Sequence, residues 1–123
     1  MSTGQHETEI VGTDACRDIA RTAVGIWKDS VGRGADFAQA FAGDYGIAMI
    51  FRGILTPLER TAVGRGEGGA IARIRREVFA ANRERLIAAV ERSSGRRVEA
   101  ALYSCSPEDD MSAFTFVLAR DDR

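Results

Sequence analysis

A buried strand gives way to a helix in the stretch Arg52-Gly53-Ile54-Leu55-Thr56-Pro57-Leu58-Glu59-Arg60. The five residues before it are all apolar, Ile47-Ala48-Met49-Ile50-Phe51, as in a strand that is covered on both faces. Thr56 is a good N-cap for the helix, Pro57 suits its first position, and Glu59 stands at the third, where it completes a capping box. This junction is well specified as structure, but it carries no chemistry of its own.

The length and composition indicate one globular domain. The chain has 123 residues, of which 45% are hydrophobic and 28% charged, with a formal net charge of -1, and this size supports a single hydrophobic core. No apolar run approaches the roughly 20 residues that span a membrane, and residues 1–7 are polar and acidic, unlike a secretory signal. We therefore expect a cytoplasmic protein without membrane insertion.

Cys16 and Cys105 match no metal or redox spacing, so we expect reduced, packed thiols.

The periodicity of the apolar residues predicts the order of the elements. After a flexible tail over 1–12, a single domain over 13–120 is expected to form a helix, a β-hairpin, a short helix, a long helix and a second hairpin. The expected bounds are 14–31 and about 70–93 for the principal helices, and 37–41, 47–54, 98–105 and 113–118 for the strands. The predicted fold class is therefore α+β, with helix–hairpin–helix–hairpin order, a four-stranded, mainly antiparallel sheet and two principal helices packed on one face.

The long helix is rich in arginine, and eight arginines lie between Arg73 and Arg97. They form either a solvated face with short-range ion pairs or a docking surface for an acidic partner or a phosphate. Arg75 and Asn82 fall in the middle of the helix's apolar stripe, where an unpaired polar group is costly. Either these groups find partners in the core, or this face points at a second molecule. The simplest case is that Arg75 extends to solvent and Asn82 bonds nearby backbone. The candidate ligand- or partner-binding residues are Arg52, Arg73, Arg75, Arg76, Asn82 and Arg83.

The sequence lacks the residues of the common catalytic sites. Its one histidine, His6, lies in the predicted tail, so a Ser–His or Cys–His pair and a zinc cluster are not expected. Asp109-Asp110 and Asp121-Asp122 are interpreted as solvated charges in a turn and a tail. The glycine-rich residues 64–69 could bind an anion weakly at the start of a helix, but they lack the Gly-Lys-Ser/Thr ending of a phosphate loop and are more simply a flexible connector. We therefore expect no enzyme activity, no metal and no cofactor.

Several short motifs are shared with a known family. They are Phe51-Arg52-Gly53-Ile54-Leu55-Thr56-Pro57, Glu59, Glu67-Gly68, Arg75-Arg76-Glu77 and the helix stop at Gly95. Through these motifs the chain resembles, over residues 32–118, the small MpsC family, which takes its name from the third component of a bacterial sodium-translocating, membrane-potential-generating system. The resemblance implies a non-catalytic accessory or regulatory protein beside a membrane ion or bicarbonate transport or membrane-potential-generating system, with a membrane protein as a candidate partner. It supplies no catalytic residues.

Two other functions stay open. The protein could be a sensor that binds a small anion or nucleotide at the arginine-rich helix or the glycine loop, or a nucleic-acid-binding module that uses the arginines of residues 73–97. The net charge of -1 disfavours a nucleic-acid partner. Exposed aromatic residues for base stacking are not expected either, because all the phenylalanines stand at positions typical of a core: Phe37, Phe41, Phe51, Phe79, Phe114 and Phe116.

Self-association is expected, most simply as a twofold homodimer. The predicted strands are apolar on both sides, and the chain has too little helix to cover a second face of the sheet. The alternative is that the tail or the short helix after Pro57 folds across that face.

Overall fold

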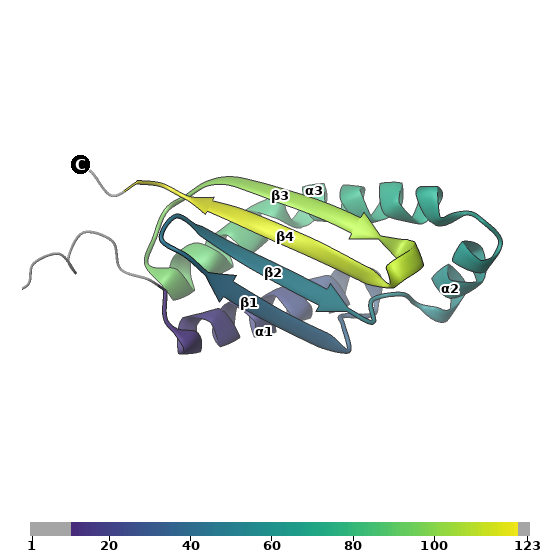
Figure 1. Ribbon diagram of the computed structural model, residues 1–123, viewed down its shortest axis with the longest axis horizontal. Helices are drawn as coiled ribbons and strands as arrows, with labels where there is room; N and C mark the ends of the chain where they lie inside the picture. The colour runs from purple at the N-terminus through teal and green to yellow at the C-terminus, as the bar shows by residue number, and fades with distance from the viewer. Residues whose placement is uncertain (1–10, 121–123) are drawn as a thin grey trace, which may run out of the picture.

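The computed structural model describes residues 11–120, which form one four-stranded sheet and three α-helices. The elements in chain order are α1 (Thr13–Val31), β1 (Phe37–Ala42), β2 (Gly46–Arg52), α2 (Pro57–Gly64), α3 (Gly68–Ser94), β3 (Val98–Ser106), the 3-10 turn η2 (Pro107–Asp109) and β4 (Met111–Leu118). The strand order is β1-β2-β4-β3, and each neighbouring pair is antiparallel. In Figure 1, α1 and α3 lie side by side against one face of this sheet. The predicted α+β class, antiparallel sheet and helical layer are confirmed.

The ends of the helices follow from the sequence. α1 and α3 both end at a glycine in the left-handed conformation, Gly32 (φ 85°) and Gly95 (φ 72°), which glycine adopts at little cost. Of the predicted flexible tail, residues 1–10 lie outside the described residues, whereas Val11 is buried against the core and Gly12 directly precedes α1.

The core lies between the helical layer and the sheet. Trp27 of α1 is fully buried, and its ring centroid lies 5.3 Å from that of Phe114 and 5.4 Å from that of Tyr103. The prediction that all six phenylalanines are core residues is wrong for two of them, because Phe37 is 51% and Phe41 47% exposed. Both belong to β1, where alternate residues point to opposite faces. The alanines of β1 face the helices, so the phenylalanines face away.

The second face of the sheet is covered by no described element, and we call it the open face. Figure 1 shows this face toward the viewer, with α2 beyond the end of β2. α2 contacts α3, so the alternative in which the short helix crosses this face is wrong. From the strand registers and the alternation of side chains, the open face consists of Phe37, Gln39, Phe41, Gly46, Ala48, Ile50, Arg52, Ala100, Leu102, Ser104, Ser106, Met111, Ala113, Thr115 and Val117.

Half of the predicted glycine-rich connector over residues 64–69 is helical. α2 ends at Gly64 and α3 begins at Gly68, so only residues 65–67 join the two helices. The N–H of Gly66 donates to the carbonyl of Val63 (2.9 Å), and the N–H of Glu67 donates to that of Ala62 (2.9 Å). The connector is therefore a tight, hydrogen-bonded turn and is shorter than the predicted range 64–69.

Candidate functional site

The chain leaves the sheet at Gly53, which has a left-handed backbone (φ 69°). A Cβ atom at this position would collide with the side chain of Asp36, so both space and conformation require glycine. Nη2 of Arg33 donates to the carbonyl of Gly53 (2.8 Å) and to Oδ1 of Asp36 (2.6 Å). Gly53 belongs to the shared motif over residues 51–57. The backbone of this turn is thus bound by an arginine that lies 20 residues earlier in the chain.

Asp110 holds the same turn from the opposite hairpin. Its carbonyl accepts the N–H of Gly53 (2.9 Å), and its Oδ1 accepts the N–H groups of Ile54 (2.7 Å) and Leu55 (2.9 Å). Its own backbone is left-handed (φ 55°), a conformation in which aspartate is enriched among non-glycine residues. The interpretation of Asp110 as a solvated charge is therefore wrong. Its carboxylate accepts the two backbone N–H groups that follow the end of β2, where the sheet no longer supplies an acceptor.

The capping box predicted at the start of α2 is confirmed. The N–H of Glu59 donates to Oγ1 of Thr56 (3.2 Å), and the N–H of Thr56 donates to Oε1 of Glu59 (2.9 Å). The helix therefore begins at Pro57, and the N–H of Glu59 in its first turn has an acceptor.

Arg75 completes the junction from α3. Its Nε donates to Oε2 of Glu59 (3.0 Å), and its Nη2 donates to Oε1 of Glu59 (2.5 Å) and to the carbonyl of Ile54 (2.8 Å). The side chain is 0% exposed, so the expectation that it extends to solvent is wrong. Burial alone would raise the pKa of Glu59, but the hydrogen bonds from Arg75 and Thr56 and the charge of Arg75 outweigh it and lower that pKa.

Asn82 is satisfied between the two principal helices. Its Nδ2 donates to Oγ of Ser30 on α1 (2.8 Å) and to the carbonyl of Val78 on α3 (3.0 Å). The expected bond to nearby backbone is confirmed. Arg85 also donates to its Oδ1 (3.2 Å), so Asn82 joins helices rather than presenting a free amide to a ligand.

The remaining candidate residues lie on the surface of two elements, β2 and α3. Arg52 is exposed on the open face, and Arg73 and Arg76 are exposed on α3. Arg83 is half-buried and pairs with its neighbour Glu84 (3.4 Å). Within residues 11–120, no hydrogen bond or ion pair joins any two of the six candidates. Arg75 belongs to the junction, and a binding role for the other candidate residues stays a prediction.

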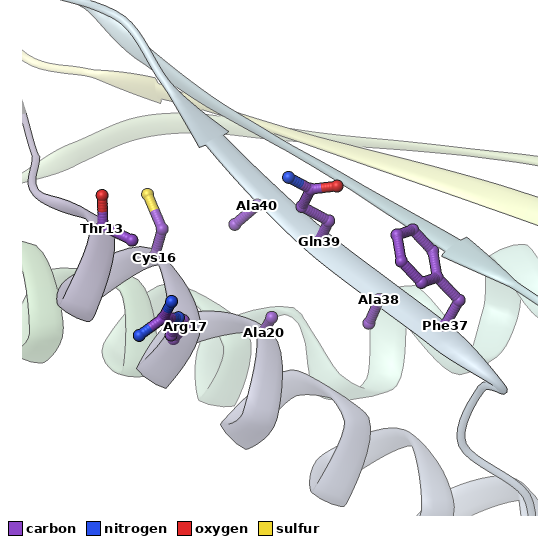
Figure 2. Close-up of a pocket in the computed structure, with 8 residues that line it drawn as sticks. All are labelled: Thr13, Cys16, Arg17, Ala20, Phe37, Ala38, Gln39 and Ala40. Atoms are coloured by element: carbon purple, nitrogen blue, oxygen red, sulfur yellow. The ribbon is translucent and has the colours of Figure 1, made fainter.

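A hollow of about 410 Å³ lies between α1 and β1. It is lined by Thr13, Cys16, Arg17, Ala20, Phe37, Ala38, Gln39 and Ala40. In Figure 2 the side chains of Ala38 and Ala40 point toward α1, and those of Phe37 and Gln39 point to the other side of the strand. Because consecutive residues of a strand point to opposite faces, a hollow lined by four of them runs along the strand's edge. A second hollow of about 320 Å³ shares Arg17, Ala20 and Ala38 with it and extends it to Val24.

Of these two hollows, one is lined by a cysteine. Burial raises the pKa of the Cys16 thiol, which lines the larger one, and that of Cys105, so neither thiol is activated as a thiolate nucleophile. Both cysteines are free, as expected.

In the described part of the chain, no three His, Cys, Asp or Glu side chains gather as a metal site would require. Over the same residues, no helix combines the length and the apolar character needed to cross a membrane.

Sequence reasoning missed Arg33, Asp36 and Asp110 as parts of the junction. A local signal existed for Asp110, because Pro-Glu-Asp-Asp before a strand favours a turn whose last residue is left-handed. No local signal tied that turn to Ile54, since the two lie 56 residues apart.

The family comparison covers almost the whole described fold. A family model described as "Na+-translocating membrane potential-generating system (MpsC)" matches residues 15–120. Neither a curated protein nor a solved structure matches the chain. The matched range includes the junction, both hairpins and the edge of β1. The chain belongs to the MpsC family.

Proposed function

We propose that this protein is a non-catalytic accessory or regulatory component of a Na+-translocating, membrane-potential-generating system. In this proposal it works in the cytoplasm and binds an extended segment of a partner protein along the free edge of β1. The family's description supports the system, and the free edge of β1 with the hollow beside it supports a binding role. Self-association is part of the same proposal.

The edge of β1 is the observation that carries this proposal. β1 and β3 are the two edge strands of the sheet. β3 has a bulge between Val98 and Ala100 and the exposed charge of Glu99, both of which discourage pairing with another strand. β1 is Phe-Ala-Gln-Ala-Phe-Ala, without a charge or a proline, and its register with β2 is unbroken. An edge of this kind is a ready template for an added strand.

The hollow beside β1 gives the added strand a place for its side chains. In strand addition, backbone hydrogen bonds hold the peptide and pockets receive alternate side chains. The alanines of α1 and β1 make the hollow apolar at its floor, and Arg17 and Arg21 stand on its rim. Their ion pairs with Asp14 (3.8 Å) and Asp18 (3.3 Å) are exposed and therefore weak. The partner segment should thus carry apolar side chains at alternate positions and an acidic group near one end.

The test uses Ala38→Phe, which fills the hollow from a half-buried position. The matched control is Ala80→Phe, which adds the same ring on the exposed side of α3. Each variant is returned to a native host that lacks the protein, and the membrane potential and the recovery of the other system components with the protein are measured. The control should restore both, and Ala38→Phe should restore neither while melting close to the wild-type temperature. A folded Ala38→Phe protein with wild-type function contradicts the proposal.

The non-catalytic part of the proposal is tested separately. A broad screen for hydrolase and transferase turnover should find none. Turnover that a single substitution abolishes would make the protein an enzyme.

A second candidate, binding of a small anion or nucleotide, is favoured by one hollow of about 190 Å³. It is lined by Gly95, Arg96, Arg97, Ala119 and Arg120 at the end of α3 and β4. An anion that binds only the folded protein raises its melting temperature, so thermal shifts with phosphate and nucleotides test this candidate. A salt titration with RNA and DNA tests nucleic-acid binding, since phosphate contacts give a steep salt dependence.

A further inference from the structure

The open face carries far less charge than the rest of the protein. Charged residues make up 28% of the chain, yet Arg52 is the one charged residue among the fifteen of the open face. Phe37, Phe41 and Leu102 expose about half of their surface there. An antiparallel sheet face that meets water normally carries polar side chains, whereas the centre of a protein interface is depleted in charge and enriched in aromatic residues.

We propose that the open face binds the open face of a second copy, so that the protein is a twofold homodimer with two packed sheets. This interface rests on the proposed self-association, and it leaves the edge of β1 free for the partner segment. Two sheets that pack face to face lie about 10 Å apart. Each copy would then have both faces of its sheet covered, one by its own helices and one by the sheet of the second copy.

The area of the open face is sufficient for a weak dimer. Strands about 4.8 Å apart with a rise of about 3.3 Å per residue make this four-stranded face roughly 20 Å by 20 Å. The flat area of the two faces together is therefore about 800 Å². Side chains make each face uneven, so the accessible surface buried by both copies is close to the ~1,000 Å² of the smallest specific interfaces. The dimer should accordingly dissociate on dilution within the micromolar range.

Side-chain size indicates how the two faces meet. On the open face β1 presents large side chains, Phe37, Gln39 and Phe41, whereas β3 presents mostly small ones, Ala100, Ser104 and Ser106, with Leu102 among them. A twofold axis parallel to the strands places β1 of each copy over β3 of the other. Phe37 and Gln39 then meet the small Ser106 and Ser104, as dense packing requires, and Phe41 makes an apolar contact with Leu102. Arg52 stands in the last row of the face, opposite Phe37 and Met111, so it stays at the wet rim.

The first experiment is sedimentation velocity across the micromolar range with the full chain. The wild type should move from monomer to dimer as concentration rises. Ala113→Lys places a charge at the centre of the open face and should weaken the dimer about 100-fold or more, because two ammonium groups would be buried without partners. The control Ala80→Lys on α3 should leave the dimer unchanged. A wild type that stays monomeric, or a dimer that Ala113→Lys leaves intact, overturns the inference.

The second experiment tests the arrangement with a short thiol-reactive cross-linker. The pair Gln39→Cys and Ser104→Cys in one chain should give covalent dimers, because these positions share a row of the sheet and face each other across the axis. The wild type, with Cys16 and Cys105 alone, gives the background. Gln39→Cys alone should stay at that background, since the two copies of β1 lie on opposite sides of the dimer. Efficient cross-linking of the single variant overturns this arrangement. Neither result depends on the β1 edge, so the partner-binding test with Ala38→Phe is unaffected.

Discussion

The junction after β2 and the open face of the sheet are built in opposite ways. At the junction, side chains from three distant segments bind the backbone: Arg33 binds the carbonyl of Gly53, Asp110 binds two N–H groups, and Arg75 binds the carbonyl of Ile54. On the open face the backbone is satisfied by the sheet itself, and the side chains are mostly apolar or small. The backbone of the motif over residues 51–57 is therefore held by side chains of the fold itself, whereas the open face leaves its side chains without a described partner.

The largest expected effect is at Arg75. Arg75→Ala leaves the carboxylate of Glu59 and the carbonyl of Ile54 without their buried partner, and this should lower the free energy of unfolding by about 3–5 kcal/mol. Arg73→Ala is the matched control on the same helix, and at this exposed position the change should stay within about 0.5 kcal/mol. Chemical denaturation measures both. Equal costs at the two positions would mean that the buried pair is not what holds the junction.

Asp110 comes next. Asp110→Ala strips the N–H groups of Ile54 and Leu55 of their acceptor and should cost about 2–3 kcal/mol. Asp109→Ala changes an exposed neighbour of the same charge and should cost much less. If Asp109→Ala proves the more damaging substitution in denaturation, the junction has been assigned to the wrong aspartate.

Thr56→Ala should cost about 1 kcal/mol through loss of the helix cap. Thr61→Ala changes an exposed threonine of the same helix, outside the cap, and serves as the control. A Thr56→Ala protein whose denaturation midpoint is unchanged, but which no longer restores the membrane potential, would give the motif a direct function in place of a structural one.

The pH dependence isolates Glu59 within the junction. Its pKa is lower in the folded protein than in the unfolded chain, so its ion pair stabilises fully above the unfolded value of about 4.3 and the gain is lost as pH falls through the folded value. Glu59→Gln should therefore flatten the stability profile below about pH 4.3 and leave its shape at neutral pH unchanged. Unfolding free energies from pH 7 to 2.5 test this, and an unaltered acid limb in the variant would exclude Glu59 as its source.

The smallest effect on stability is expected on the open face. Ala113→Lys should change the free energy of monomer unfolding by no more than about 0.5 kcal/mol, because the position is exposed. Denaturation at a concentration below the dimer's dissociation range measures this value. A large loss of monomer stability would place Ala113 inside the fold's own packing and remove the contrast with the junction.

The sequence predicts those features that depend on neighbours along the chain. The capping box of Thr56 and Glu59 spans three residues, and the position of Arg75 within an apolar stripe follows from helical periodicity alone. The partner of Arg75 was not predicted, because Glu59 lies 16 residues away on another helix. The core placement of Phe37 and Phe41 is wrong because nothing local states which face of β1 the helices cover. Strand order is set by how the two hairpins pair, through β2 and β4.

The bonds from Asp110 to Ile54 and Leu55 also have a consequence for hydrogen exchange. These two amides lie between elements, where amides normally exchange with solvent through small local openings. Here their acceptor is a side chain from the turn before β4, so the protection of both amides depends on a contact between the first hairpin and the second. We expect slower exchange at these two amides than at other amides between elements, and Asp110→Ala should remove that protection.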